Sequence, residues 1–237
     1  MTPTPTPVVL SWSGGKDSAL ALERLRADPA VEIVSLTTTV SAEYNRISMH
    51  GVRRSLLHRQ VACLRLPLTE IELGAAPSNA AYEAGFAAGL ARLQSAHPGV
   101  RTMAFGDLFL EEVRQYREVL LARSGWTGLY PLWGEPTSLL AQHFIHAGYR
   151  AVLSCVDTTQ LDSGFAGREF DAQLLRDMPT AVDPCGERGE FHTYVYAGPI
   201  FHEPVSIRLG ERVLRERRFQ YCDLLESDAG ATAQAAV

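Results

Sequence analysis

A glycine-rich stretch near the N-terminus, SGGKDS at residues 13–18, has the composition of a phosphate-binding loop. It follows the apolar run PVVLSW and leads into a helix-like stretch, so it occupies a predicted strand-to-helix turn. The first N–H groups of a helix attract an anion, and glycine lets phosphate approach the backbone without a Cβ in the way. Serine hydroxyls and a lysine add donors and positive charge. The residues expected to bind a nucleotide here are Ser11, Ser13, Gly14, Gly15, Lys16, Asp17 and Ser18.

Asp17 is the unusual member of this stretch, because phosphate repels a carboxylate. It suits a helix N-terminus, and it is also the candidate Mg²⁺ ligand of the loop. The spacing differs from a Walker A loop, since Leu10 stands where the first glycine is required and Asp17 follows Lys16. It also differs from the GxGxxG turn of dinucleotide-binding proteins. A Gly-Gly turn that only opens a helix stays as the alternative.

The elements that must position this loop alternate between strand and helix along the chain. Apolar, β-branched runs predict strands, and apolar residues at helical spacing predict the helices between them. Strands are expected at 7–12, 32–40, 65–73, 100–107 and 149–157, and helices at 16–27, 52–64, 79–93, 111–125 and 136–148. This order predicts an α/β fold with an open, mostly parallel, doubly wound sheet that carries helices on both faces.

Ligands of such sheets bind beyond the carboxyl ends of the strands. Gly106 and Asp107 end the predicted fourth strand, and Thr37 lies in the second. His50 opens the predicted second helix beside the expected nucleotide cleft, where capping of the helix is the competing role. We therefore expect these four residues on the nucleotide side of the sheet.

After about residue 160 the pattern changes to a smaller mixed portion. A helix is expected over 167–178, then a turn-rich stretch to residue 193, then strands with turns at Gly198–Pro199 and Gly210–Glu211. The predicted division is a nucleotide-binding domain over 8–160 and a substrate-side domain over 161–226. Disordered tails are expected at 1–7 and 227–237, where large apolar residues are few.

Composition limits the class of protein. The 237 residues carry a formal net charge of −5, which argues against a surface dedicated to nucleic acid. The sequence has no apolar run near 18 residues and no signal-peptide core, so no membrane span is expected. Its four cysteines are far apart and form no CxxC pair, which indicates reduced thiols and a cytoplasmic protein.

The stretch SGGKDS resembles the PP-loop, SGGxDS, of the N-type ATP pyrophosphatases. Enzymes of that superfamily cleave ATP between its α- and β-phosphates, and their loop holds the pyrophosphate that leaves. The resemblance implies an adenine nucleotide alpha hydrolase-like fold that binds ATP with Mg²⁺. By itself the loop names no acceptor, since relatives make amides, guanidines and thiolated bases.

A second segment, DPCGERGEFHTYVYAGPIF at 183–201, resembles the C-terminal signature of diphthine–ammonia ligases. That signature is of the type Gly-Glu-x-Gly-Glu-aromatic-Glu-Thr, and His192 stands here in place of the usual acidic residue. Segments 49–68 and 105–118 are also similar to that family, so the resemblance covers roughly residues 8–225. The form GEFHT is more similar to a bacterial branch of the family whose substrate is unsettled.

The resemblance implies a C–N ligase reaction. A carboxylate attacks the α-phosphorus of ATP, pyrophosphate leaves, and ammonia then attacks the acyl-adenylate to give an amide and AMP. The implied partners are ammonia and a small-molecule or protein carboxylate acceptor, with a homodimer as the expected assembly. The residues expected to act in catalysis are Lys16, Asp17, Glu187, Glu190 and His192. Because a two-substrate reaction needs both motifs near one cleft, the turn at 186–193 is expected to fold back over the carboxyl edge of the sheet and face the loop at 13–18. The carboxylates of this turn, Glu190 first, are expected to recognise the acceptor or ammonium.

Each of these assignments has an alternative. In the alternative, Glu187 and Glu190 are solvated carboxylates of an ordinary turn, and His192 is an ordinary strand histidine. Cys185, which belongs to the same segment, is expected to be structural. Two other function classes also stay open. A tRNA-modifying PP-loop enzyme would carry basic patches, zinc-ligand cysteines or a catalytic cysteine pair, and none is visible in the sequence. An adenine-nucleotide sensor would bind ATP without turnover.

Overall fold

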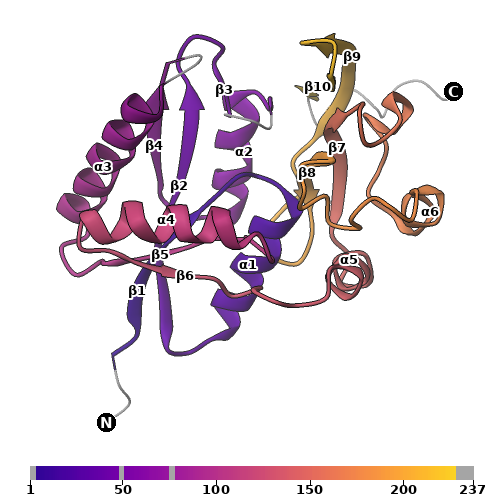
Figure 1. The fold of residues 1–237 in the computed structure, drawn as a ribbon. Coiled ribbons are helices and arrows are strands. Elements are labelled where there is room, and N and C mark those ends of the chain that lie inside the picture. The colour runs from indigo at the N-terminus through magenta and orange to yellow at the C-terminus, as the bar shows by residue number, and fades with distance from the viewer. Residues whose placement is uncertain (1–3, 48–50, 75–77, 228–237) are drawn as a thin grey trace, which may run out of the picture.

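The computed structural model describes residues 4–47, 51–74 and 78–227. Two sheets divide this part of the chain, a larger and mostly parallel one formed by N-terminal residues and a four-stranded antiparallel one formed by C-terminal residues (Figure 1). The predicted class, an α/β fold with a smaller mixed C-terminal portion, is confirmed.

The larger sheet is centred on β1 (Thr6–Ser11), which lies parallel between β2 (Val31–Ser41) and β5 (Thr102–Ala104). The outer strands β4 (Leu68–Leu73) and β6 (Thr127–Leu129) pair in parallel with β2 and β5 respectively. A short strand, β3 (Arg46–Ile47), pairs antiparallel with the end of β2. Strand β1 begins at Thr6, inside the stretch expected to be a tail.

Helices cover both faces of this sheet because successive side chains of a strand point to opposite faces. Val8 and Leu10 of β1 pack into one core with α1 (Lys16–Ala27) and α2 (Arg54–Leu64). Val9, between them, packs into a second core with α3 (Asn79–Ala96) and α4 (Glu111–Arg123). The doubly wound arrangement is therefore confirmed, with two helices on each face.

The smaller sheet has the order β8 (Phe191–Ala197), β7 (Arg150–Asp157), β10 (Phe219–Glu226), β9 (Ile207–Arg215), with all neighbours antiparallel. The prediction that 149–157 adds a strand to the parallel sheet was wrong. Residues 151–157 are buried throughout, and such a run has the same pattern in either kind of sheet. The domain limits 8–160 and 161–226 stay a prediction.

Two local predictions in this portion were also wrong. The helix expected over 167–178 is confined to α6 (Ala172–Asp177). Asp171 caps the N-terminus of this helix, because its side chain accepts a hydrogen bond from the Leu174 N–H. No turn occurs at Gly210–Glu211, since β9 runs through both residues. The chain reverses instead over residues 216–218, where Glu216 and Arg217 have φ angles of 53° and 54°, as at the centre of a type I′ turn.

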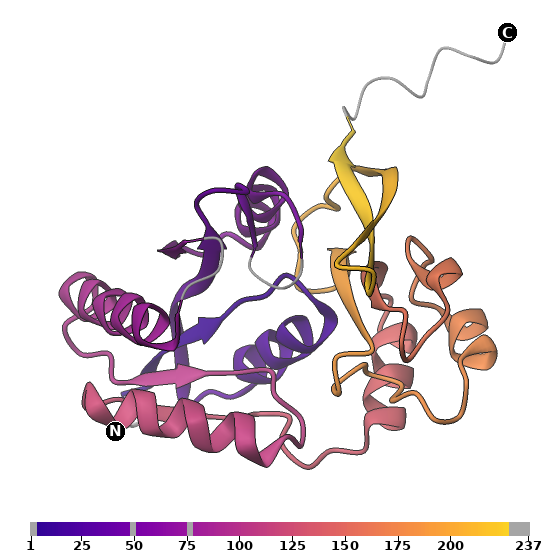
Figure 2. The same ribbon diagram turned by 45° about the horizontal axis from the view of Figure 1, so that its top comes forward.

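The two sheets share a core. Phe144 of α5 (Thr137–His146) and Leu153 of β7 belong to the same buried cluster as Leu10 of β1. In both views α1 lies between the larger sheet and the smaller one (Figure 2). On the surface, the Asp223 carboxylate of β10 forms ion pairs with Arg46 at 2.9 Å and Arg53 at 2.6 Å. These contacts tie the C-terminal sheet to β3 and to the start of α2.

Candidate active site

The loop at residues 13–18 connects the carboxyl end of β1 to the start of α1. Gly14 has a φ of +79°, and a Cβ there would lie 2.7 Å from Gln60 Oε1. A Cβ on Gly106, in the segment after β5, would lie 2.8 Å from the carbonyl carbon of Asp17. Glycine at these two positions therefore lets the loop pack directly against α2 and against the segment that follows β5.

The turn at residues 186–193 lies against this loop. The Lys16 N–H donates a 3.0 Å hydrogen bond to Thr193 Oγ1, and the Val195 N–H donates a 2.9 Å bond to the Gly14 carbonyl. Lys16 Nζ also donates to the carbonyl of Cys185. The prediction that the second motif folds back over the loop at the carboxyl edge of the sheet is confirmed.

A pocket of about 200 Å³ lies between the loop, the segment after β5 and the turn. This volume is below the range of about 300–1,000 Å³ typical of sites that enclose a whole small molecule. The pocket therefore suits one end of a nucleotide, such as its phosphates. The predicted residues that line it are Ser11, Ser13, Gly15, Lys16, Asp17, Ser18, Gly106, Asp107, Glu187 and His192.

Other predicted residues are not among those that line the pocket. Thr37 is buried, and its hydroxyl donates a 2.9 Å hydrogen bond to the Thr69 carbonyl, which ties β2 to β4. Gly14 belongs to the loop and contacts Gln60 of α2. His50 lies outside the described residues.

Glu190 is also not among the residues that line the pocket. Its side chain is buried, with 2% exposed, and its two oxygens accept hydrogen bonds from the N–H groups of Asp183 and Arg188, each at 2.9 Å. These bonds close residues 183–190 into a compact turn. The observed contacts of Glu190 are therefore with the backbone of its own turn.

Lys16 lines the pocket but is almost fully buried. Only 2% of the residue is exposed, and Nζ lies 2.8 Å from Asp17 Oδ2 and donates to the Cys185 carbonyl. Burial lowers the pKa of Lys16, but the combined interactions with Asp17, Cys185 and Glu187 outweigh burial and the pKa is raised. Burial raises the pKa of Asp17, against the opposing effect of Lys16. Lys16 thus joins α1 to the turn.

Glu187 is a carboxyl group of the pocket whose pKa lies near neutral pH. Burial, followed by the nearby Asp17 charge, raises its pKa to about 7, although the Leu108 N–H opposes this. That N–H donates to Glu187 Oε1 at 2.8 Å, which connects the turn to the segment after β5. A carboxyl group with this pKa can exchange a proton with a bound reactant at physiological pH.

His192 and Cys185 are uncharged at neutral pH. Burial, and then the Lys16 charge, lowers the pKa of His192 to about 4, so its imidazole is neutral. Burial raises the pKa of Cys185 to about 12, and its Sγ donates a 3.3 Å hydrogen bond to the Thr137 carbonyl. A buried thiol with this pKa is not a nucleophile, in agreement with the structural role expected for Cys185.

Two residues of the site were not predicted from the sequence. Gln60 of α2 is fully buried and bonds to the loop and to β8. Arg117 of α4 lines the pocket and forms an ion pair with Asp107 at 2.8 Å. The one signal for Gln60 is its place on the apolar face of α2, four residues after Leu56 and four before Leu64. Nothing in the sequence distinguishes Arg117 from the other charged residues of α4.

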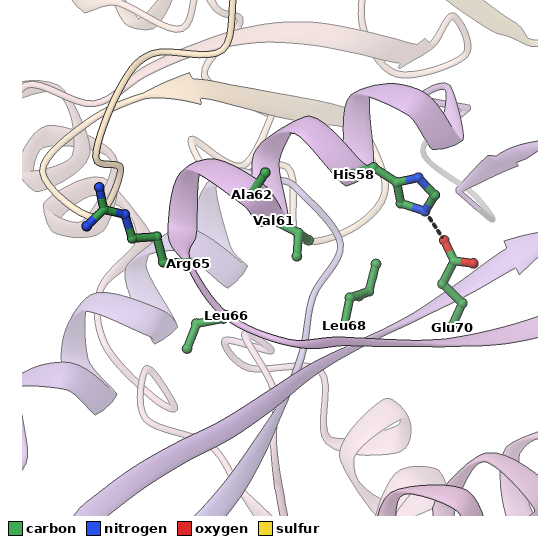
Figure 3. Close-up of a pocket in the computed structure, with 7 residues that line it drawn as sticks. All are labelled: His58, Val61, Ala62, Arg65, Leu66, Leu68 and Glu70. Carbon is green, nitrogen blue, oxygen red and sulfur yellow. Dashed lines mark hydrogen bonds and ion pairs between the residues drawn. The ribbon is translucent and has the colours of Figure 1, made fainter. Parts of the chain in front are cut away.

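A second, wider pocket of about 430 Å³ lies between α2 and β4 (Figure 3). It is lined by apolar side chains such as Val61 and Leu68 and by the pair His58–Glu70, whose atoms Nε2 and Oε1 are 2.7 Å apart. This pocket lies beside the first half of β4, away from the carboxyl ends of the strands. The smaller pocket is therefore the candidate site, since it holds the predicted residues.

Within the described ranges, the His, Cys, Asp and Glu side chains form no group of three or more that could hold a metal ion. Three carboxyl groups, those of Asp17, Asp107 and Glu187, nevertheless line the pocket. Mg²⁺ is commonly bound by one or two carboxylates together with phosphate oxygens of a substrate. The donor set therefore fits a Mg²⁺ ion that enters with a nucleotide, and the assignment to Asp17 stays a prediction.

None of the described helices is long and apolar enough to cross a bilayer.

Comparison with known proteins finds two family models. A model described as the diphthamide synthase N-terminal domain matches residues 6–127, and one described as the diphthamide synthase C-terminal domain matches residues 136–225. A curated relative, diphthine–ammonia ligase of Schizosaccharomyces pombe, is 24% identical over 212 residues, which cover 82% of this chain and 35% of the relative. The chain thus spans about a third of that relative's length.

Proposed function

The chain belongs to the diphthamide synthase family, and from this premise we propose that it is an ATP-dependent amide ligase that releases AMP and pyrophosphate. The observation that carries the proposal is that the loop at 13–18 and the turn at 186–193 line the same pocket. A ligase must bring a nucleotide and an acceptor together, and these two segments contribute most of the residues of one small site.

The loop is proposed to hold the β- and γ-phosphates of ATP. The first turn of α1 begins after Gly15, and Gly15 and the first helical residues line the pocket. Ser13 and Ser18 line the pocket with their hydroxyl groups 3.2 Å apart. Helix N–H groups, the helix dipole and these hydroxyls together favour a bound polyphosphate.

The reaction is proposed to proceed by adenylation of a carboxylate. The acceptor oxygen attacks the α-phosphorus, the bond to the β-phosphate breaks, and ammonia then displaces AMP from the acyl-adenylate. Catalysis of this kind depends on placement and on charge stabilisation rather than on a covalent protein nucleophile. A bound Mg²⁺, held by Asp17 and by phosphate oxygens, would neutralise part of the charge on the leaving pyrophosphate.

Glu187 is proposed to take the proton that the attacking ammonia loses. Its pKa of about 7 matches that task, and it lines the pocket beside the loop. His192, neutral and with a lowered pKa, suits an acceptor contact better than it suits proton transfer. The fission yeast relative is a diphthine–ammonia ligase, which supports ammonia as the nitrogen donor. The acceptor is proposed to be a carboxylate.

The test is product analysis. The purified chain is incubated with ATP, Mg²⁺ and ammonium, with and without a panel of carboxylates, and nucleotides are separated by ion-exchange chromatography. AMP and pyrophosphate in equal amounts, dependent on a carboxylate and on Mg²⁺, are the expected result. ADP with orthophosphate as the main products would contradict the proposal. ATP binding without turnover under any condition would instead favour a nucleotide sensor.

A further inference from the structure

We propose that the side chain of Arg117 supplies the positive charge that binds the phosphates of the nucleotide, and that Asp107 is a positioning residue for it. This inference rests on the proposed function, because it assumes a nucleotide in the pocket. It assigns to α4 a part in binding that the loop motif does not contain.

Arg117 lies where the sheet topology favours a ligand. Strand β1 has β2 on one side and β5 on the other, and the chain leaves both β1 and β5 at the same edge of the sheet. Crevices at such a reversal of strand order are the usual ligand sites of open α/β sheets. Arg117 lines the pocket at this point, together with Asp17 after β1 and Gly106 after β5.

The guanidinium of Arg117 is held in a fixed orientation. Its Nε lies 2.8 Å from Asp107 Oδ2, its Nη2 donates a 3.1 Å hydrogen bond to Asp107 Oδ1, and its Cζ lies 4.5 Å from the centre of the Phe105 ring. Asp107 thus contacts the edge formed by Nε and Nη2. The Nη1 edge, with two N–H groups, faces the other way and suits a phosphate oxygen.

Lys16, the other cation that lines the pocket, already has partners for its three N–H groups. Nζ donates to Asp17 Oδ1 at 2.9 Å, to Asp17 Oδ2 at 2.8 Å and to the Cys185 carbonyl. Its side chain is 3% exposed, whereas that of Arg117 is 28% exposed. Of these two cations, Arg117 is the one that an incoming polyphosphate can reach without breaking contacts inside the protein.

The same geometry changes the part expected of Asp107. A carboxylate in direct contact with phosphate oxygens is repelled, but one that pairs with a guanidinium orients a positive charge toward them. The Asp107 side chain is 14% exposed, and its two oxygens lie against Arg117. Asp107 therefore acts through Arg117.

The experiment compares Arg117→Gln with Arg114→Gln. Arg114 lies three residues earlier on α4, pairs with Glu118 at 2.8 Å and lies 4.7 Å from the rings of Tyr130 and Trp133, and it is not among the pocket-lining residues. Each variant is titrated calorimetrically with an ATP analogue that has a methylene group between the α- and β-phosphates, and separately with adenosine. Thermal melting reports folding.

Arg117→Gln is expected to weaken binding of the analogue at least about tenfold, as for loss of a charge-assisted contact. Adenosine lacks phosphate, so its affinity should change less than about twofold, and Arg114→Gln should leave both affinities unchanged. If Arg117→Gln does not fold, the double variant Asp107→Asn/Arg117→Gln removes both charges of the pair and should show the same loss.

Unchanged affinity for the analogue in these Arg117 variants overturns the inference and leaves the proposed function standing. An equal loss in Arg114→Gln also overturns it, because the effect would then come from the overall charge of α4. Failure of the unaltered chain to bind the analogue at all overturns the proposed function, and the inference with it.

Discussion

The side-chain amide of Gln60 donates a hydrogen bond of 2.9 Å to the carbonyl oxygen of Gly14. The same Nε2 donates to the Val195 carbonyl at 2.6 Å, and Oε1 accepts from the indole N–H of Trp12 at 3.1 Å. One buried side chain of α2 thus fixes the candidate phosphate loop and the adjacent strand of the other sheet relative to each other.

Replacement of Gln60 by leucine should destabilise the chain. The Val195 carbonyl and the Trp12 indole would lose a partner in a buried environment, at a cost of about 1–3 kcal/mol for each unsatisfied group. Urea unfolding measures this loss. Gln115→Leu is the matched control, because Gln115 is exposed on α4 and bonds only to the exposed side chain of Glu111 among its described contacts. Equal effects of the two substitutions would contradict the prediction.

Glu187 should make the stability of the chain depend on pH. Burial raises its pKa from 4.5 to about 7, so the folded state favours the protonated form. The stabilising contribution is therefore fully present below about pH 4.5 and is lost as the pH rises to about 7. Relative to Glu187→Gln, the free energy of unfolding of the unaltered chain should fall across this window and stay level above it. Parallel curves for the two proteins would refute the assignment.

Glu190→Ala should act first on stability. The substitution leaves the N–H groups of Asp183 and Arg188 without their carboxylate acceptor. About 1–3 kcal/mol is expected for the buried N–H of Asp183, and less for that of Arg188, which is an exposed residue. Differential scanning calorimetry should show a lower Tm, and near-saturating ATP analogue should not restore it fully. From the motif alone we expected Glu190 to act on the acceptor. Unchanged stability with lost turnover would support that earlier expectation.

The thiol of Cys185 should react slowly with iodoacetamide in the folded chain. Its pKa of about 12 leaves almost no thiolate at pH 8, and the residue is 2% exposed. In urea all four cysteines should alkylate at similar rates, and peptide mapping by mass spectrometry identifies each site. Rapid labelling of Cys185 in the folded protein would contradict the structural role and make this thiol a candidate nucleophile.

The sequence predicted the parallel sheet and the neighbouring positions of the two motifs, and each prediction had a local signal. Strand and helix periodicity identified the βα units, and the motifs SGGKDS and GERGEFHT identified the residues expected at the site. No local signal shows to which sheet 149–157 belongs. The strands that pair with it lie in the last 50 residues of the chain, and a buried apolar run has the same pattern in parallel and antiparallel sheets.

Side-chain roles were harder to predict than positions. Lys16 was expected to face phosphate, but the Cys185 carbonyl and the Asp17 carboxylate surround its ammonium group. Arg117 lies on a charged helix whose pattern is typical of any solvent-facing surface, so only its proximity to Asp107 and Phe105 distinguishes it. Such roles depend on contacts between distant segments, which periodicity does not record.

The bond between the Lys16 N–H and Thr193 Oγ1 joins residues that are 177 positions apart. During synthesis on a ribosome, the phosphate loop therefore leaves the exit tunnel long before the strand that completes it. Until residues 193–195 emerge, the Gly14 carbonyl and the Lys16 N–H of a nascent chain lack these partners. The candidate site is therefore complete only after residues 193–195 have emerged, and a chain that stalls before them carries the complete PP-loop sequence without a finished loop.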